Sequence, residues 1–410
     1  MNGNQNKVDL DEFLSIQAGL LRLIPKARRR FLAEKIDWNK RLLGIVGARG
    51  TGKTTILLQY LASQDIRRQR HLYVSADHVR VQANGVYELA SYFFRLGGEN
   101  IVIDEIHKYA NWPQELKNLY DAFPGARIFF SGSSTLALQK GKADLSRRAV
   151  FHNLPGLSFR EYIYLAHGKK FKPFAFEDLL KNHSVLAFEI LEKGPILGYF
   201  RDYLRYGVYP FFLESIDDYI PKLLNVLEKV LYEDIPTVSG IKTTNVPVLK
   251  RILWLVATSD PFKPNIERMS RNLKISKEYV YTYLDLLERA KVLSGFLPSE
   301  TGYRLVRKPS KIYMENTNLL RAVAGEIGAQ GRVGVVRETF VANQLKNAGL
   351  NVRIPSRGDF LVEGKFLLEI GGKRKRKNQI QGVENAFIVK DDIEIGLNNV
   401  IPLWMFGFLY

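Results

Sequence analysis

Short apolar runs alternate with helical patterns in the first third of the chain. Runs without polar alternation predict strands at residues 42–46, 71–74, 101–103 and 127–130. Apolar positions at helical spacing predict helices at 86–96 and 112–123, and residues 8–40 are also expected to be helical. Strands of this kind are buried on both faces, as in a parallel sheet that helices cover. The pattern therefore predicts an α/β core with a parallel sheet.

The rest of the chain has a different texture. Residues 157–235 are expected to be mainly helical, and a second helical block is expected at 243–293. The last hundred residues or so have a β-rich pattern with Gly-rich turns. Within them, residues 400–410 are too few to span a bilayer and predict a terminal strand docked on a core.

The chain carries a large excess of positive charge. Its 60 Lys and Arg residues outnumber 42 Asp and Glu residues, which gives a formal net charge of +18 at pH 7. The excess is clustered at residues 28–30, 67–70 and 373–377. Clusters favour a polyanionic partner, most simply nucleic acid and in particular double-stranded DNA. A basic surface that serves solubility, or that binds anionic lipid, is the alternative.

The absence of cysteine excludes disulfide frameworks and thiolate metal sites. This composition fits a reducing compartment. Residues 1–10 are polar and lack the apolar segment of a signal peptide. We therefore expect a cytoplasmic protein without a membrane partner.

A glycine-rich motif directly follows the first predicted strand. Residues 47–54 spell Gly-Ala-Arg-Gly-Thr-Gly-Lys-Thr, and a helical pattern follows. A strand, loop and helix of this kind hold a nucleoside triphosphate, because glycines let backbone N–H groups wrap the phosphates. We expect ATP, with Lys53 at its β- and γ-phosphate oxygens and the Thr54 hydroxyl on Mg²⁺. The residues expected to bind the nucleotide are Gly47, Gly50, Thr51, Gly52, Lys53, Thr54 and Thr55.

Two carboxylates end the third predicted strand, where Asp104 and Glu105 follow apolar residues 101–103. ATP hydrolysis needs one acid in the Mg²⁺ shell and a second that orients or deprotonates the attacking water. We assign Asp104 to Mg²⁺ and Glu105 to the water. An ordinary surface strand end is the alternative, which the preceding P-loop disfavours. His107 could touch the same network, although a structural role is the simpler interpretation.

The fourth predicted strand ends in hydroxyl side chains. Ser131 or Ser133 could sense the γ-phosphate, and we select Ser133; capping of a following helix is the alternative. Arg147 and Arg148 precede the next apolar segment. We select Arg148 as an arginine finger that neutralises transition-state charge, with two solvated arginines as the alternative. A finger that acts on a neighbouring chain would require a homo-oligomer.

Several strings together resemble a known group of proteins. Besides the P-loop and residues 101–105, they are Gly132-Ser133-Ser134, Leu157-Ser158-Phe159-Arg160-Glu161-Tyr162 and Gly207-Val208-Tyr209-Pro210. They are similar to strings of the bacterial and archaeal AAA-type predicted ATPases that carry a C-terminal domain of unknown function, although Val208 replaces a glycine. The resemblance covers nearly the whole chain. It implies an ATPase core, a winged-helix region and a C-terminal fold similar to restriction endonucleases.

Residues 264–290 have the pattern of a helix–turn–helix. Ile266, Met269 and Leu273 share one face, and Ser276 is expected to cap a second helix. A hairpin pattern begins at 292–297, so we predict a winged helix. Its outward side chains Lys277, Tyr281 and Arg289 would meet phosphates or base edges. Contact with another protein is the alternative.

Glu338, Asp359 and Glu369 are candidates for a second, nuclease-like metal site. Restriction-endonuclease sites hold a metal with acids on neighbouring strands, and a lysine two positions after the Glu shares its strand face. Residues 358–370 would form a hairpin. A three-residue loop would place Asp359 opposite Glu369, and a two-residue loop would place it opposite Leu368.

The lysine expected in such a site is missing, because position 371 is Gly371. Lys365 and Lys373 are substitutes by sequence position. A surviving fold that has lost its chemistry, or that binds nucleic acid, is therefore favoured over an active nuclease. The basic run 373–377 fits a grip on nucleic acid, with a solvated loop as the alternative.

Together the patterns predict four parts of the chain. They are an AAA-type P-loop ATPase domain with a helical lead-in at 1–165, a helical lid or linker at 166–240, a winged helix at 241–310 and a restriction-endonuclease-like α/β domain at 311–410. We predict that ATP hydrolysis changes the placement of the last two domains on DNA. The alternatives are an ATP-gated, Mg²⁺-dependent nuclease and a nucleotide-dependent scaffold for a partner protein.

Overall fold

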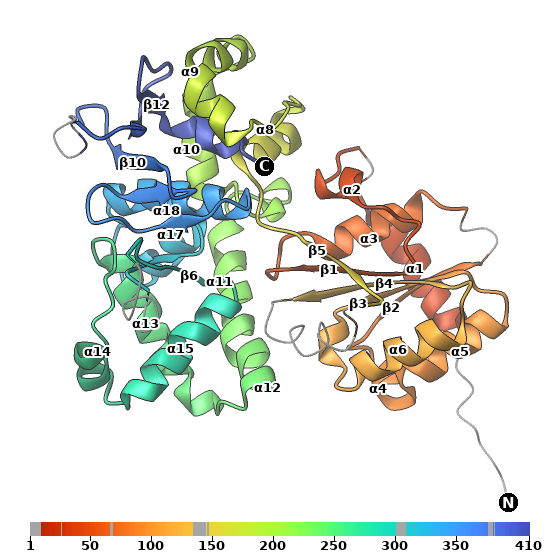
Figure 1. The fold of residues 1–410 in the computed structure, drawn as a ribbon. Helices are drawn as coiled ribbons and strands as arrows, with labels where there is room; N and C mark the ends of the chain where they lie inside the picture. Colours follow the sequence, from red (N-terminus) through yellow and green to blue (C-terminus); the bar gives the residue numbers. More distant parts are fainter. Residues whose placement is uncertain are drawn as a thin grey trace, which may run out of the picture. The chain divides into compact units, whose positions relative to one another are not determined.

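The computed structural model describes residues 10–25, 27–65, 69–133, 145, 147–300, 309–375, 380 and 382–410. The chain divides into two compact units, Met1–Pro155 and Gly156–Tyr410, which we call the N-terminal and the C-terminal unit. Each unit has its own five-stranded sheet (Figure 1).

The sheet of the N-terminal unit has the order β2-β3-β4-β1-β5, and its described strands pair in parallel. The strands are β1 Leu42–Gly47, β2 His71–Ser75, β3 Asn100–Asp104, β4 Arg127–Ser133 and β5 Val150–Asn153. The helices are α1 Leu10–Leu23, α2 Leu32–Lys35, α3 Lys53–Ala62, α4 Val79–Asn84, α5 Val86–Arg95 and α6 Trp112–Ala122. Figure 1 shows helices on both sides of this sheet.

Alternate residues of one strand enter two different cores. Ile101 and Ile103 pack in a cluster with α5 and α6, whereas Val102 packs in a cluster with α3. Because helices cover both faces, each strand needs apolar residues at consecutive positions. The predicted parallel α/β core is confirmed.

The helical stretch expected at 8–40 is wrong in part. α1 ends at Leu23, and α2 contains only 4 residues. Pro25 lacks an N–H donor and disfavours helical backbone in the residue before it, which explains the break.

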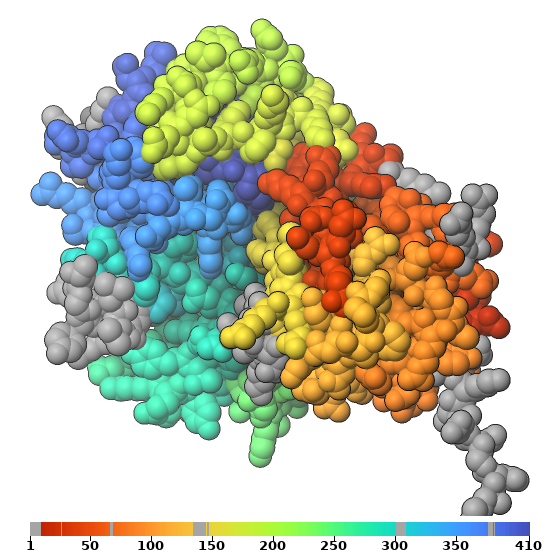
Figure 2. Space-filling model, turned by 45° about the vertical axis from the view of Figure 1, so that its right-hand side comes forward, coloured from red at the N-terminus to blue at the C-terminus, as the bar shows by residue number. Residues whose placement is uncertain are grey.

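Helices dominate the first part of the C-terminal unit, as predicted. They are α8 Phe159–His167, α9 Phe176–Leu191, α10 Ile196–Tyr206, α11 Tyr219–Lys229, α12 Ile235–Ser239, α13 Val246–Thr258, α14 Ile266–Leu273 and α15 Lys277–Arg289. The α9 segment, coloured yellow-green, lies at the surface in Figure 2, and its Val185 and Phe188 side chains are exposed.

The end of the chain mixes helices and strands. An antiparallel pair, β6 Leu293–Phe296 with β7 Lys311–Met314, precedes α17 Thr317–Glu326 and α18 Val333–Asn347. The second sheet has the order β12-β11-β10-β9-β8, with strands β8 Val352–Arg353, β9 Phe360–Val362, β10 Phe366–Gly371, β11 Ala386–Lys390 and β12 Val400–Pro402. The β-rich expectation for this region missed both helices. In α18 the residues from Thr339 to Leu345 are all buried. Because this part of the helix has no exposed face, its sequence lacks the alternation of apolar and polar positions that predicts a helix.

The apolar end of the chain is docked on a core as predicted, but most of it is not a strand. β12 ends at Pro402, and Leu403–Phe408 form a buried 3₁₀ helix, η6. Pro402 has no N–H with which to continue the ladder. A Cβ at Gly407 would lie 2.3 Å from the Phe159 Cβ, so η6 packs closely on α8.

None of the helices in the described ranges is both long and apolar enough to cross a bilayer. The cytoplasmic location and the four domain boundaries stay predictions. β7 lies beyond the predicted boundary at 310, yet it pairs with β6 before it.

Candidate nucleotide-binding site

The glycine-rich loop joins β1 to α3. Gly50 and Gly52 have φ angles of 82° and 93°, which residues with side chains rarely adopt. At Gly47, a Cβ would lie 2.3 Å from the Leu154 carbonyl oxygen. The backbone therefore requires glycine at all three positions, as in a loop that wraps a phosphate.

Lys53 and Thr51 are buried in this loop. The Lys53 side chain is 4% exposed, and its Nζ donates to the carbonyl oxygens of Gly47 at 3.1 Å and Ala48 at 2.9 Å. The Thr51 hydroxyl also donates to the Ala48 carbonyl oxygen, at 2.9 Å. The lysine ammonium is thus held at the loop, where the anionic phosphates of a nucleotide would meet it.

Arg30 supports the loop and is not displayed on the surface. Its side chain is buried, and its guanidinium donates to the carbonyl oxygens of Thr51 and, at 2.9 Å, Pro155. Sequence reasoning counted Arg30 in a basic cluster for nucleic acid. In a run of consecutive arginines, the sequence does not indicate which side chain is buried.

Asp104 organises the carboxyl ends of β2, β3 and β4. Within the described part of the chain, it accepts hydrogen bonds from the hydroxyls of Thr54 at 2.7 Å, Tyr73 at 3.0 Å and Ser131. Burial, with the nearby charge of Asp104, raises the pKa of Tyr73, so its phenol stays a donor. The two predicted Mg²⁺ ligands, Thr54 and Asp104, therefore touch, and both present the oxygen atoms that Mg²⁺ prefers.

Glu105 lies beside this network in the left-handed backbone region, with φ of 50°. Its N–H donates to Ser131 Oγ at 3.2 Å. Its Oε2 is buried 3.8 Å from the Arg49 guanidinium and 3.3 Å from His107 Nε2, and it makes no hydrogen bond within the described residues. A buried carboxylate oxygen that lacks a donor fits a residue that orients water.

His107 connects Glu105 with Ser133. The Ser133 N–H donates to His107 Nδ1 at 3.3 Å, and Ser133 Oγ lies 2.7 Å from Nε2. Since Nδ1 accepts from this N–H, a neutral ring would carry its proton on Nε2, which contacts Ser133 Oγ and lies 3.3 Å from Glu105 Oε2. Sequence reasoning raised a contact of His107 with this network, from its place two residues after Glu105, but preferred a structural role.

Strand register brings these residues to one edge of the sheet. Gly47 pairs with Ser133, and Ser75 pairs with Asp104, each at the end of its strand. The carboxyl edge of a parallel sheet is where α/β folds bind ligands. Thr55 lies in the first turn of α3 beside the loop.

The predicted finger residue is engaged with an acid in the same unit. Arg148 forms a two-pronged pair with Asp121, with both donor–acceptor distances 3.0 Å. Its role as a finger stays a prediction.

The three acids of the second candidate site lie in the C-terminal unit. Val362 pairs with Phe366, which is the register of the three-residue loop and brings Asp359 opposite Glu369.

Lys311 Nζ lies 3.1 Å from Glu338 and 3.5 Å from Asp359. Burial raises the pKa values of Glu338 and Glu369. In the described ranges no group of three or more His, Asp or Glu side chains is placed to hold a metal ion, and here an ammonium lies between two of the acids. The residues as placed do not fit a metal.

Lys375 takes the place of the lysine missing at position 371. Its Nζ pairs with Glu369, whose side chain is buried. A Cβ at Gly371 would lie 2.6 Å from Lys375 Cγ and Cδ, so the glycine leaves room for the lysine stem. The chain turns back after Gly372, and sequence reasoning, which considered Lys365 and Lys373, could not see this. Residues 67, 68, 376 and 377 of the basic clusters lie outside the described residues.

Two strings that carried the resemblance have structural roles. Ser158 caps α8 by accepting from the Glu161 N–H, and Arg160 donates to the main-chain oxygens of Tyr410 at 3.0 Å and Phe171 at 2.9 Å. The Val208 N–H donates to Asn318 Oδ1 at 2.8 Å. These strings hold the C-terminal unit together.

Comparison with known families agrees with the geometry of the N-terminal site. Residues 39–163 match a family described as an AAA domain, and residues 197–329 match one described as a domain of unknown function, DUF8612. The chain thus carries an AAA-type P-loop ATPase domain, which implies nucleotide binding. It is also 28% identical to the uncharacterized protein MJ1637 of Methanocaldococcus jannaschii, over 94% of this chain and 89% of the relative.

Solved structures show weaker likeness. The Hsp104–ADP complex of S. cerevisiae has a TM-score of 0.32 at 15% identity, covering 69% of this chain and 42% of that one. AMPPCP-bound DnaA from Aquifex aeolicus has a TM-score of 0.27 at 13% identity, covering 68% and 88%. PCH-2 of C. elegans has 0.23 at 18% identity, covering 38% and 44%. This chain spans less than half of the Hsp104 and PCH-2 chains, and no argument rests on scores this low.

Proposed function

We propose that the N-terminal unit binds ATP with Mg²⁺ and hydrolyses it. The loop at 47–54 holds the triphosphate through its N–H groups, and Lys53 neutralises the β- and γ-phosphate oxygens. Thr54 and Asp104 hold Mg²⁺, which neutralises phosphate charge when bound. Mg²⁺ usually takes one or two protein oxygens and completes its shell with water and phosphate, so this pair is sufficient.

The observation that carries the proposal is the Glu105 Oε2, buried beside the Asp104 network without a donor. Glu105 orients the attacking water and accepts its proton. His107 helps to position Glu105, because its Nε2 lies 3.3 Å from Oε2. Ser133 reports the state of the γ-phosphate through its contact with His107.

The test compares ATP turnover and nucleotide affinity in the wild type, Glu105→Gln and Lys53→Ala. Glutamine keeps the shape of Glu105 but does not take a proton, so turnover should fall by about a hundredfold or more with affinity unchanged. Lys53→Ala should lose both affinity and turnover, because the phosphates lose their ammonium partner.

Glu99→Gln is the matched control. Glu99 lies just before β3, at the end of the strand opposite to Asp104, and pairs with Arg70 at the surface. Such pairs contribute little, so turnover should not change. If wild-type protein binds ATP without turnover, and Glu105→Gln changes nothing, the nucleotide-dependent scaffold replaces the ATPase.

We also propose that the C-terminal unit contacts double-stranded DNA through α14 and α15. Asn265 and Ser276 cap the two helices, and the β6–β7 pair follows, which supports a winged helix. This green-cyan segment is open to solvent in the view of Figure 2. Lys277 and Arg289 are already paired with Glu267 and Asp285, so the exposed Tyr281 is the better candidate for contact.

DNA should accelerate ATP turnover, and binding should weaken steeply with salt if phosphates are gripped. Tyr281→Ala should weaken binding. Tyr232→Ala is the control, because both tyrosines are 41% exposed. If DNA leaves turnover unchanged at every salt concentration, the DNA link is wrong and a protein partner is favoured.

We further propose that hydrolysis changes the placement of the domains in the C-terminal unit. The chain has no cysteine, so one cysteine introduced on the N-terminal unit and one on α15 can carry a dye pair. Energy transfer between the dyes should differ between ATP-bound Glu105→Gln and the ADP-bound protein. Equal transfer in both states would remove this part of the proposal.

The Glu369–Lys375 pair favours the nuclease alternative, because it supplies a lysine beside the acid. Lys311 disfavours it, because its ammonium lies between Glu338 and Asp359, where a metal would be held. We expect no Mg²⁺-dependent cleavage of DNA by the wild type. Cleavage that Glu369→Ala abolishes and Glu384→Ala, an exposed acid elsewhere in the unit, preserves would establish the nuclease instead.

A further inference from the structure

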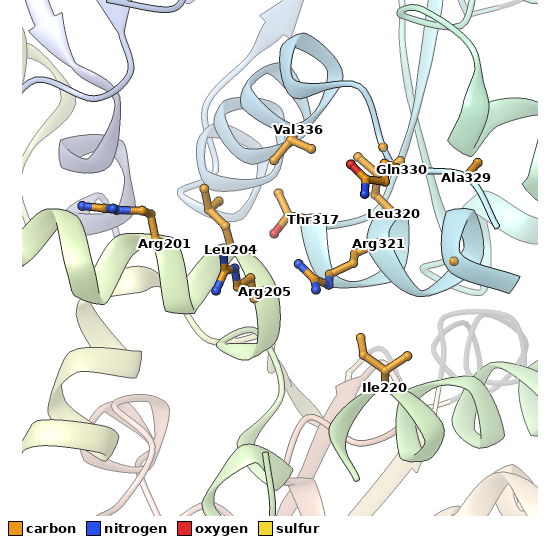
Figure 3. Close-up of a pocket in the computed structure, with 12 residues that line it drawn as sticks. Arg201, Leu204, Arg205, Ile220, Thr317, Leu320, Arg321, Ala329, Gln330 and Val336 are labelled. Atoms are coloured by element: carbon orange, nitrogen blue, oxygen red, sulfur yellow. The ribbon is translucent and has the colours of Figure 1, made fainter. Parts of the chain in front are cut away.

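The C-terminal unit contains a cavity that no motif pointed to. It has a volume of about 720 Å³ and lies among α10, α11, α17 and the segment that leads into α18 (Figure 3). Cavities that bind small ligands have volumes of about 300–1,000 Å³. The cavity is therefore large enough for a nucleotide-sized molecule.

Three exposed arginines line this cavity, and within the described residues none of them forms an ion pair. They are Arg201 and Arg205 on α10 and Arg321 on α17. In Figure 3 the guanidinium group of Arg321 is directed toward Arg205, whereas Arg201 points away from both. Among the described residues that line the cavity, none is Asp or Glu.

Two arginines that are next to lining residues in the sequence form ion pairs, unlike those that line the cavity. Arg332 pairs with Asp260 and Arg337 with Asp391, while Arg205 and Arg321 form no ion pair within the described ranges. Asp202, the acid next to Arg201 in sequence, is hydrogen-bonded to Tyr206. Two like charges that face one another are stabilised by an anion placed between them.

Thr317 adds a hydroxyl to the same space. It is the first residue of α17, its side chain is buried, and Figure 3 shows its oxygen directed toward the gap between Arg205 and Arg321. The Asn316 side chain already accepts from the N–H groups of residues 318 and 319. The N-terminus of α17 therefore contributes its positive potential and the Thr317 hydroxyl to the cavity. The N–H groups of residues 318 and 319 are already used by the Asn316 cap.

Apolar side chains complete the cavity. Leu204, Leu320, Val336 and Ile220 line it beside the arginines. An inorganic anion would leave this apolar surface uncovered, whereas a nucleoside would pack on it.

We propose that this cavity binds a nucleoside phosphate, with its phosphate between Arg205 and Arg321 and its base and sugar on the apolar side. The phosphate comes from a free nucleotide or from one unit of a nucleic-acid strand. This site is in the C-terminal unit, and it is additional to ATP hydrolysis at the P-loop.

The test uses the full chain carrying Lys53→Ala, with two probes. AMP lacks the β- and γ-phosphates that the P-loop recognises, and a labelled single-stranded oligothymidylate represents the strand. AMP affinity is measured by calorimetry and oligonucleotide affinity by fluorescence anisotropy. Arg321→Gln and Arg205→Gln should each weaken binding by about tenfold or more, since each removes charged hydrogen bonds to phosphate.

Arg251→Gln is the control, because Arg251 is exposed on α13, does not line the cavity and carries the same charge. Arg321→Lys should recover part of the affinity, since lysine keeps the charge and loses the planar fork. A selective loss for AMP identifies a free nucleotide, and a selective loss for the oligonucleotide identifies a strand. If Arg321→Gln and Arg251→Gln bind both probes alike, the proposal is overturned, whatever the ATPase assay shows.

Discussion

One backbone donor decides the state of His107. The Ser133 N–H occupies Nδ1, so a neutral ring would carry its proton on Nε2, the atom that lies 2.7 Å from Ser133 Oγ and 3.3 Å from Glu105 Oε2. A residue that acts through Glu105 in this way affects how well the water is oriented and leaves nucleotide binding alone. A change in turnover with nucleotide binding unchanged therefore distinguishes a positioning residue from a residue that only packs.

His107→Ala should lower kcat by roughly ten- to hundredfold with KM for ATP unchanged, because Glu105 loses the group that holds it. His107→Gln, whose amide can donate to Glu105, should recover part of the rate. Steady-state kinetics over a range of ATP concentrations measures both effects. A parallel change in KM would assign His107 to the fold of the loop instead.

His183 in α9 should make stability depend on pH. Its side chain is buried, and burial lowers its pKa below the ordinary value of 6.5 for histidine. The unfolded chain then binds more protons than the folded one as pH falls below 6.5, so stability is lost in that range. His183→Met does not titrate, so it should gain stability relative to the wild type as pH is lowered. Denaturant unfolding at several pH values measures this, and a constant difference would contradict it.

At the scale of elements, α3 can start only where a glycine precedes it. Gly52 has φ of 93° and ψ of 26°, and Lys53 begins the helix in the next position. The turn that aims the helix at the nucleotide therefore depends on one backbone conformation. A Cβ is disfavoured there, independently of any contact.

Gly52→Ala should cost about 1–2 kcal/mol of stability and lower nucleotide affinity. Gly19→Ala should instead raise the stability of the protein. Gly19 lies inside α1, and a Cβ there would meet nothing within 4 Å. Alanine in a helix interior is favoured over glycine by roughly 0.5–1 kcal/mol. Thermal unfolding and nucleotide titration of the two variants test the pair, and equal effects would contradict the argument.

The same scale shows what local patterns could predict. Residues 101–103 of β3 were predicted because each of them enters a core, and the cap of α15 was predicted because Ser276 is adjacent to the helix that it caps. The hairpin of β9 and β10 left two registers open. Packing chose the three-residue loop, in which Phe360 and Leu368 pair with both side chains buried.

At the scale of the whole molecule, the two units contain separate sheets. Scanning calorimetry should therefore show two transitions. A nonhydrolysable ATP analogue at about 100 times its Kd stabilises its site by ~2.7 kcal/mol, which should raise one transition by roughly 5–10 °C. Lys53→Ala should abolish the shift. A single transition that rises with the analogue would show instead that the units unfold as one.

The sequence by itself determined the parallel core, the P-loop and the paired acids Asp104 and Glu105, because these depend on residues adjacent in the chain. Only the tertiary structure decided that Arg30 turns inward, that Lys311 lies between Glu338 and Asp359, and that Lys375 covers Gly371. It also decided that Arg205 and Arg321, which are 116 positions apart, face one cavity. The reason is physical: a charge acts on whatever lies within a few ångströms, and the pattern along the chain does not record which distant segments meet there.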